Sequence, residues 1–184
     1  MKEIIMYRDQ EITIFPDENP EKPDLWNDES FLVYDHRDLC IERKDFDPTE
    51  IFEHIESTKK WFYNGFYVFP VYAYIHSGIV LSVGSHNFPD ARWDVFRGFC
   101  LVQRMKGMWE RKKCFLIAES IIEEWNMYLS DDVWGYDSAF GGCCGYYGDA
   151  GKEQMILEAK AEIDYVLTQR QMEIDKLQLK LQFD

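Results

Sequence analysis

The stretch FYVFPVYAYIHSGIVLSVG (66–84) decides the fold class expected for this chain. Its two halves are rich in aromatic and β-branched residues, and His76-Ser77-Gly78 supplies a turn between them, which predicts a β-hairpin. RGFCLVQR (97–104) follows as a further β-like run. Together these segments predict an antiparallel meander. Pro70 indicates an edge or a bulge in it, because proline cannot donate a hydrogen bond to a neighbouring strand.

The first 60 residues add three more β-like runs around a long loop. EIIMYR (3–8) and EITIF (11–15) predict a hairpin that turns at residues 8–10, and FLVYDHR (31–37) predicts a third strand. The intervening PDENPEKPDLWNDES (16–30) contains three prolines and six acids. This composition predicts an exposed loop without regular structure.

A short helix is predicted to begin at Asp47-Pro48-Thr49-Glu50. Asp47 is a good N-cap, proline fits the first turn, and Glu50 completes the spacing of a capping box. The helix is expected to end near residue 57, with Phe52 and Ile55 facing the core.

Two long helices are predicted further along the chain, over 110–130 and over about 151–180, from apolar residues at helical spacing. Asp149 is the expected cap of the last helix. A helix of roughly 30 residues is about 45 Å long, which exceeds the width of a domain of this size. Its end is therefore expected to protrude, to pair with a second copy or to meet a partner.

These elements predict an α+β fold, with an antiparallel sheet of about five to six strands, a short helix, and two long helices packed on one face. Three segments are expected within one compact domain. They are an acidic N-terminal part (1–60), a central sheet and helix (61–150) and the C-terminal helix (151–184).

The charge is unevenly distributed along the chain. The net charge is −14, with −9 in residues 1–60, +4 in 61–115 and −9 in 116–184. Such a protein repels nucleic acids and membrane surfaces and is attracted to basic clefts on other proteins. MKEIIMYRDQ (1–10) meets charge too early for a secretory signal, and no apolar run reaches the roughly 20 residues of a membrane helix. Five cysteines without a signal favour reduced thiols in a reducing cytoplasm.

The acidic loop is the first candidate binding segment, because its charges would steer an encounter and its tryptophan would anchor it. The alternative is that the tryptophan packs on its own domain. Acids of the 110–130 helix form a second acidic face. The predicted partner-binding residues are Asp17, Glu18, Glu21, Asp24, Trp26, Asp28, Glu29, Glu119, Glu123 and Glu124.

A basic cluster is the second candidate, as a nucleic-acid contact. Its members are Arg104, Lys106, Trp109, Arg111, Lys112 and Lys113. The alternative is a solvated helix start paired with neighbouring acids.

Two catalytic hypotheses are weaker. Asp131, Asp132, Asp137 and Asp149 supply oxygen ligands that would suit a divalent cation in a metal-dependent hydrolase. His76 and Ser77 lie too close in sequence for the usual geometry of a nucleophile and its base, so this segment is interpreted as a turn. The glycine-rich FGGCCGYYGDAG (140–151) lacks the lysine of a phosphate-binding loop and is interpreted as a packing element.

The central part of the sequence resembles a family of small proteins of phages and conjugative elements. The resemblance is carried by VYAYIHSGIVLSVGSHNFPDARWDVFRGFCLV (71–102), AESIIEEWNMYLSDDVWGY (118–136) and GGCCGYYGDAGKEQMILEAKAEI (141–163). Two departures are that Val-Phe-Arg-Gly follows Trp93-Asp94, where the family has a short Ser-Gly segment, and that residues 1–60 lie outside the resemblance. It implies a mobile-element origin and a role in host defence or DNA transfer.

Together, charge and resemblance predict a non-enzymatic, anti-CRISPR-like inhibitor from a phage or mobile element, without a cofactor. Its expected partner is a basic host nuclease or the guide-RNA complex of that nuclease, with carboxylates occupying a cleft that normally receives phosphates. A homodimer through the C-terminal helix is one of the three arrangements left open for the end of that helix. A nucleic-acid-binding accessory protein and a metal hydrolase are the alternatives.

Overall fold

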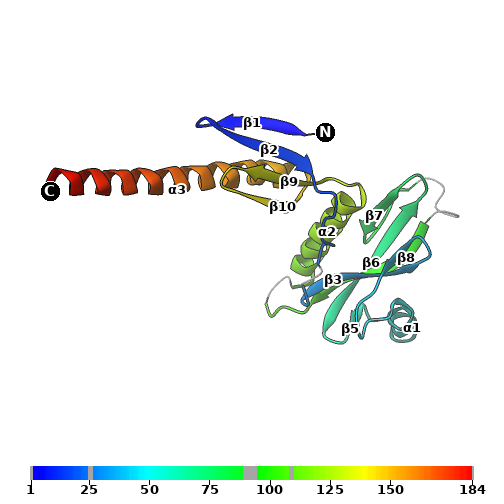
Figure 1. Ribbon diagram of the computed structural model, residues 1–184. Helices are drawn as coiled ribbons and strands as arrows, with labels where there is room; N and C mark the ends of the chain where they lie inside the picture. The colour runs from blue at the N-terminus through cyan, green and yellow to red at the C-terminus, as the bar shows by residue number, and fades with distance from the viewer. Residues whose placement is uncertain (1, 25–26, 89–94, 108–109, 184) are drawn as a thin grey trace. The chain divides into compact units, whose positions relative to one another are not determined.

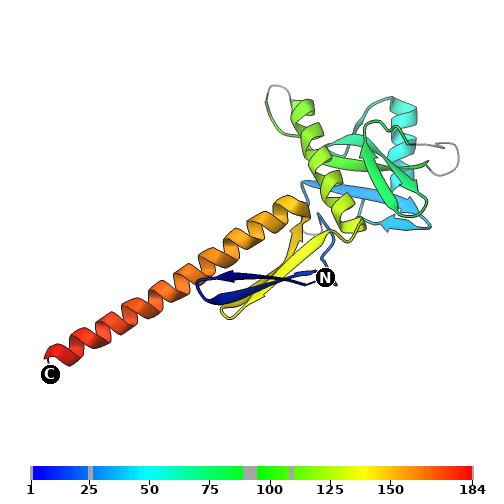
Figure 2. The same ribbon diagram turned by 90° about the horizontal axis from the view of Figure 1, so that it is seen from above.

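The computed structural model describes residues 2–24, 27–88, 95–107 and 110–183, and only the backbone of 95–97 and 180–183 (Figures 1 and 2). The chain divides into two compact units. Unit 1 contains Met1–Pro20 and Asp131–Asp184, and unit 2 contains Glu21–Ser130. The two ends of the chain therefore belong to one unit. The boundaries between the units, at 20/21 and 130/131, differ from those of the three segments expected from the sequence.

Unit 1 is a four-stranded antiparallel sheet with one long helix. The strands β1 (Glu3–Tyr7), β2 (Gln10–Pro16), β9 (Val133–Ser138) and β10 (Gly141–Tyr147) lie in the order β1-β2-β9-β10. Arg8 and Asp9 turn the first hairpin with positive φ angles of 49° and 61°, as a tight turn between twisted strands requires. This confirms the predicted N-terminal hairpin.

The long helix α3 (Gly148–Phe183) covers this sheet with its N-terminal half only. Met155, Ala159 and Ile163 are fully buried against Ile12 and Ile14 of β2. The helix begins three residues earlier than predicted, and Asp149 lies exposed in its first turn.

The glycine-rich segment forms strand β10, which its amino-acid pattern did not predict. Glycine has low β propensity, but here small residues are required by close approach. A Cβ on Gly135 of β9 would lie 2.6 Å from the sulfur of Cys144, and a Cβ on Gly142 would lie 2.7 Å from the carbonyl oxygen of Tyr136. The interpretation as a packing element is confirmed to this extent.

Unit 2 is built on a six-stranded antiparallel sheet. Strands β4 (Leu39–Ile41), β3 (Ser30–His36), β8 (Val95–Gln103), β6 (Phe66–Ile75) and β5 (Phe62–Tyr63) follow in this order, and β7 (Ile79–Val83) also pairs with β6. The predicted hairpin of 66–84 and the antiparallel pairing of 97–104 are confirmed. The meander order was wrong, because β8 pairs with β6, on the edge opposite to β7, and not with β7. Pro70 lies where one edge of β6 passes from pairing with β5 to pairing with β7. Its missing N–H therefore removes no hydrogen bond from either pair of strands.

Two helices cover opposite faces of this sheet (Figures 1 and 2). On one face α2 (Glu110–Leu129) packs Cys114, Ala118, Ile122 and Trp125 against residues such as Leu32 and Val71. On the other face α1 (Pro48–Thr58) packs Ile51 and Ile55.

The predicted start of α1 is confirmed, since Asp47 accepts a hydrogen bond from the Thr49 N–H at 2.6 Å. The inward placement of Phe52 was wrong, because its side chain is 42% exposed while Ile51 is buried.

The α+β class, the antiparallel pairing, the short helix and the two long helices are confirmed. Within the described residues the strands are divided between sheets of four and six strands. The long helices were expected on one face of a single sheet, but α2 belongs to unit 2 and α3 to unit 1.

Candidate functional site

A buried carboxylate holds the acidic loop of unit 2 in place. Asp24 Oδ2 accepts hydrogen bonds from the backbone N–H of Leu32 at 2.8 Å and from Trp125 Nε1 at 3.0 Å. Asp24 Oδ1 contacts Arg43 Nη2 at 3.0 Å, and the same nitrogen donates to the backbone carbonyl of Asp24. We call these four residues the Asp24 anchor. It ties the loop to β3, to α2 and to the turn after β4.

This arrangement corrects the prediction that Asp24 is an exposed contact for a partner. Its side chain is only 5% exposed, and that of Arg43 is 17% exposed. A charge is stable in such a place only when charged or polar partners surround it. Asp24 is therefore a structural residue of the loop and does not meet solvent.

The electrostatics of the anchor are dominated by burial. Burial raises the pKa of Asp24, and the hydrogen bonds from Trp125 and Leu32 and the charge of Arg43 lower it by a smaller amount. The pKa of Glu124 on α2 is also raised, first by burial and then by the charge of Asp24. The acidic face of α2 therefore lies within electrostatic reach of the loop.

The loop beyond Asp24 is held by a second set of bonds. Asn27 Oδ1 accepts from the backbone N–H groups of Glu29 and Ser30, both at 3.0 Å. The Glu29 carbonyl accepts from the Gln103 N–H of β8 at 2.6 Å. Asp28 and Glu29 are exposed between these points. Their carboxylates thus stand on a fixed backbone.

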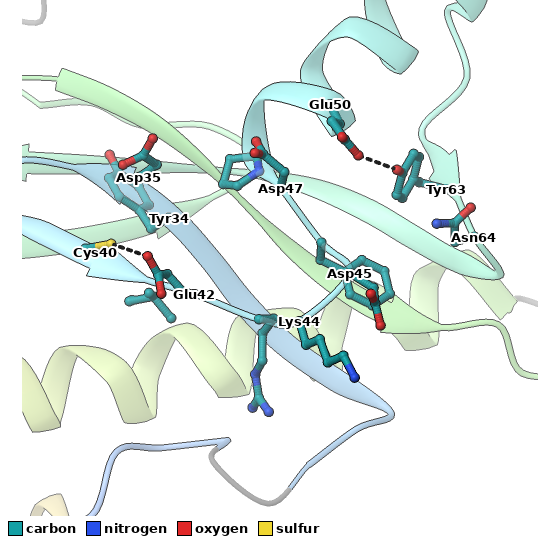
Figure 3. Close-up of a pocket in the computed structure, with 14 residues that line it drawn as sticks. Tyr34, Asp35, Cys40, Glu42, Lys44, Asp45, Asp47, Glu50, Tyr63 and Asn64 are labelled. Carbon is teal, nitrogen blue, oxygen red and sulfur yellow. Dashed lines mark hydrogen bonds between the residues drawn. The ribbon is translucent and has the colours of Figure 1, made fainter.

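An acidic hollow of about 940 Å³ lies next to the anchor, and Arg43 belongs to its lining (Figure 3). Five carboxylates line it, and all five residues are exposed: Asp35, Glu42, Asp45, Asp47 and Glu50. Lys44 is also in the lining, whereas the guanidinium of Arg43 is bonded to Asp24. The hollow consequently has an excess of negative charge.

Contacts inside the hollow engage some of these acids. Tyr63 Oη lies 3.5 Å from Glu50 Oε2, and Cys40 Sγ lies 3.8 Å from Glu42 Oε1 (Figure 3). Burial, followed by the charges of Glu42 and Asp35, raises the pKa of the Cys40 thiol, so this thiol is not activated as a nucleophile. The hollow is suited to receive cationic groups and lacks an activated cysteine.

Sequence reasoning missed this hollow. The available signal was ERKDFDPTE (42–50), which contains four acids and two bases around the helix start. The prediction used only the capping role of Asp47, because the spacing of a capping box explains two of its acids without reference to a site.

The remaining predicted partner-binding residues lie in both units. Asp17 and Glu18 belong to unit 1, where Asp17 Oδ1 accepts from the Asn19 N–H at 3.0 Å. Glu21 is exposed in the loop of unit 2. On α2, Glu119 is half-buried, and Glu123 and Glu124 are exposed. Trp26 lies outside the described residues.

The basic cluster of the alternative hypothesis is partly engaged by its own unit. Arg104 Nε lies 3.0 Å from Glu110 Oε1, and its guanidinium lies 6.0 Å from the ring centroid of Phe62. Lys106, Arg111, Lys112 and Lys113 are exposed, and Trp109 lies outside the described residues. The pairing of Arg104 agrees with the interpretation as a solvated helix start.

The four aspartates of the metal hypothesis are not brought together. Asp131 and Asp132 precede β9, and the Asp132 carbonyl accepts from Gly148 N at 2.9 Å, beside Asp149. Asp137 lies five residues along β9, about 16 Å away in an extended strand. In the described part of the chain, no group of three or more His, Cys, Asp or Glu is placed to hold a metal ion.

The His76-Ser77-Gly78 segment forms the turn between β6 and β7, as interpreted. The His76 N–H donates to the Gly78 carbonyl at 3.1 Å. This backbone hydrogen bond closes the turn and agrees with a structural role for the segment.

Comparison of the chain with protein-family models, curated proteins and solved structures finds no match. The resemblance to mobile-element proteins therefore stays a prediction from sequence motifs. Among the helices of the described residues, none combines the length and apolarity needed to cross a membrane.

Glu124→Gln is expected to stabilise the protein at pH 7 by a few tenths of a kcal/mol, a small effect because solvent screens this carboxyl. The folded state raises the pKa of Glu124, so its charged form is penalised above that pKa. Below the unfolded pKa of about 4.3 both states are protonated and the penalty disappears. Urea unfolding of both proteins should show the gain at pH 7 and none near pH 3.5. An equal gain at both pH values would contradict this cause.

Proposed function

We propose that the protein is a non-enzymatic inhibitor of a nucleic-acid-handling host protein, most readily a defence nuclease such as a CRISPR effector. Its carboxylates occupy a basic cleft that otherwise receives phosphates. The sequence motifs that resemble proteins of phages and conjugative elements agree with this role, and so does the net charge of −14.

The observation that carries the proposal is the Asp24 anchor. An acidic loop without regular structure would ordinarily be mobile, and ordering it during binding would cost free energy. Here a buried carboxylate fixes the loop to β3 and α2, so the exposed Asp28 and Glu29 are presented in advance. Arg43 joins the loop to the hollow that contains Glu42 and Asp45.

The chemistry of this surface also supports binding over turnover. Carboxylates on a fixed backbone complement the basic side chains of a phosphate-binding cleft. They also raise the association rate by electrostatic steering. Among the described residues, the hollow has no group of three or more His, Cys, Asp or Glu placed to hold a metal ion, and the pKa of its Cys40 thiol is raised by burial. The contact residues proposed in unit 2 are Glu21, Asp28, Glu29, Glu42, Asp45, Glu50, Glu123 and Glu124.

The target is identified by a pull-down from host lysate at two salt concentrations, followed by mass spectrometry. The purified nuclease is then loaded with labelled nucleic acid, and displacement by the inhibitor is measured. We expect Asp28→Lys/Glu29→Lys to weaken displacement at least tenfold, or about 1.4 kcal/mol, since attraction becomes repulsion at two points. The affinity of the unmodified protein should fall as salt increases.

A matched control separates local contacts from net charge. Glu11→Lys/Glu153→Lys changes the total charge by the same amount at two exposed positions of unit 1. This variant should retain displacement within about twofold. An equal loss of displacement in both variants would show that the effect comes from the overall charge and not from contacts of the loop. Full displacement by the loop variant would remove the loop from the mechanism, and direct nucleic-acid binding by the inhibitor would favour the basic cluster.

A further inference from the structure

The C-terminal part of α3 extends beyond the sheet of its own unit. The helix has 36 residues, but its buried positions end at Ile163 and its last partly buried apolar side chain in that core is Leu167. Every described side chain from Thr168 to Leu179 is exposed. In both views the red end of α3 continues past β1, β2, β9 and β10 (Figures 1 and 2).

This exposed part carries large apolar side chains. Ile174 is 46% exposed and Leu177 is 59% exposed. Residues 168–183 span about 24 Å, and a single helix of this length is marginal in water without packing. A helix that exposes several large apolar side chains over more than three turns is typical of an interaction surface.

The apolar residues follow the spacing of a coiled-coil seam. Ile163, Leu167, Arg170, Ile174, Leu177 and the helix position 181 are separated alternately by four and three residues. These are the d and a positions of successive heptads. The first two pack on the sheet of unit 1, and the seam then continues into the exposed part. The same stripe thus packs in the core of unit 1 up to Leu167 and is exposed after it.

The charge of this segment favours a second copy of the chain as the occupant. Residues 168–179 contain Arg170 and Lys176 against Glu173 and Asp175, which gives no net charge. In a protein of net charge −14, this neutral segment is a place where two copies meet without local repulsion between the helices. A strongly basic partner of the kind proposed above would gain no attraction here.

The position of Arg170 selects the orientation. In a parallel pair, the two Arg170 side chains would share one layer of the seam, and like charges in one layer are destabilising. In an antiparallel pair, Ile174 of each copy shares a layer with Leu177 of the other. Arg170 then lies at the end of the paired segment, level with position 181. Its guanidinium already packs 4.9 Å from the ring centroid of Phe140 in its own unit.

From these observations we infer that the protein forms a homodimer through an antiparallel two-helix coiled coil of the C-terminal part of α3, centred between Ile174 and Leu177. The dimer carries two copies of unit 2, and therefore two acidic surfaces. The inference does not depend on the proposed inhibitor function, because it concerns unit 1 alone.

Sedimentation velocity of the full chain from about 1 to about 200 µM tests the dimer. The unmodified protein should shift from monomer to dimer across this range. Ile174→Asp/Leu177→Asp places charges in the central layers and should remain monomeric at every concentration. Met172→Asp is the matched control, because Met172 is 48% exposed but lies off the seam, and it should dimerise like the unmodified protein.

Two results would overturn the inference. The unmodified chain could stay monomeric throughout, which would leave the seam to a different protein, or the seam variant could dimerise as well as the control, which would place the interface elsewhere. Circular dichroism of the three proteins checks that the units stay folded.

The orientation is tested by the distance between spin labels at Gln169→Cys, in a background where the exposed Cys40, Cys143 and Cys144 are serine. An antiparallel pair centred between 174 and 177 separates the labelled positions by about 20 Å along the axis. A parallel pair leaves them at the same level, about 10 Å apart across the helix axes, and this short distance would overturn the antiparallel assignment.

Discussion

Asp24→Ala is expected to lower the free energy of unfolding by about 3–5 kcal/mol, the range seen when one partner of a buried ion pair is removed. The substitution leaves Trp125 Nε1 and the Leu32 N–H without the oxygen that now accepts from both. It also takes from Arg43, a side chain only 17% exposed, the carboxylate that it contacts. Each buried donor that loses its acceptor costs about 1–3 kcal/mol. Urea unfolding, followed by tryptophan fluorescence, measures the loss.

The control for this prediction lies four residues away. Asp28 is exposed, and Asp28→Ala should change the free energy of unfolding by no more than about 0.5 kcal/mol. The pair of variants therefore separates the two roles of acids in one loop, a structural role for Asp24 and a surface role for Asp28. A loss below about 1 kcal/mol in Asp24→Ala would show that water or another side chain replaces the carboxylate.

The role of Asp24 could not be predicted from the sequence, because its partners are distant along the chain. Trp125 lies 101 residues away, and Arg43 lies 19 residues away. Composition describes all six acids of 16–30 alike, as solvated charges. Burial of one of them is a tertiary event that no local pattern records. Long-range contacts add to the reason why the hollow was missed, since β3, β4, the β5–β6 turn and the segment from the end of β4 to the start of α1 all line it.

Elements set by local interactions were predicted well. The turn at Arg8 and Asp9, the Asp47 cap and the hairpin of β6 and β7 each depend on residues close in sequence. The division into two sheets depends on β2 pairing with β9, more than 100 residues later. Such long-range pairing has no local signal. The alternation of apolar and polar residues indicates which face of a strand is buried, but it does not indicate which other strand lies beside it.

Gly98→Ala is expected to destabilise unit 2 by about 3 kcal/mol or more, at or beyond the upper end of the usual cost of overpacking a core. A Cβ at this position would lie 2.1 Å from Tyr34 Cδ2 and 2.7 Å from the carbonyl oxygen of Val33. The strand that carries Gly98, β8, pairs with β3 on one side and with β6 on the other. Neither neighbour can move away without breaking ladder hydrogen bonds. Urea unfolding and the near-ultraviolet circular dichroism of the aromatic core measure the effect.

The neighbours of Gly98 allow its cause to be separated into a side-chain part and a backbone part. Tyr34 is fully buried, and removing its ring in Tyr34→Ala opens space for the new methyl group, whereas the Val33 carbonyl stays in place. Gly98→Ala should therefore cost less in the Tyr34→Ala background than alone, with a residual cost from the backbone contact. Gly78→Ala is the control for the substitution itself, because a Cβ there meets no atom within 4 Å. It should change stability by no more than about 0.5 kcal/mol. A Gly98→Ala protein as stable as the Gly78→Ala protein would mean that β3 and β8 can separate at this point, and the close approach would then not be required by the fold.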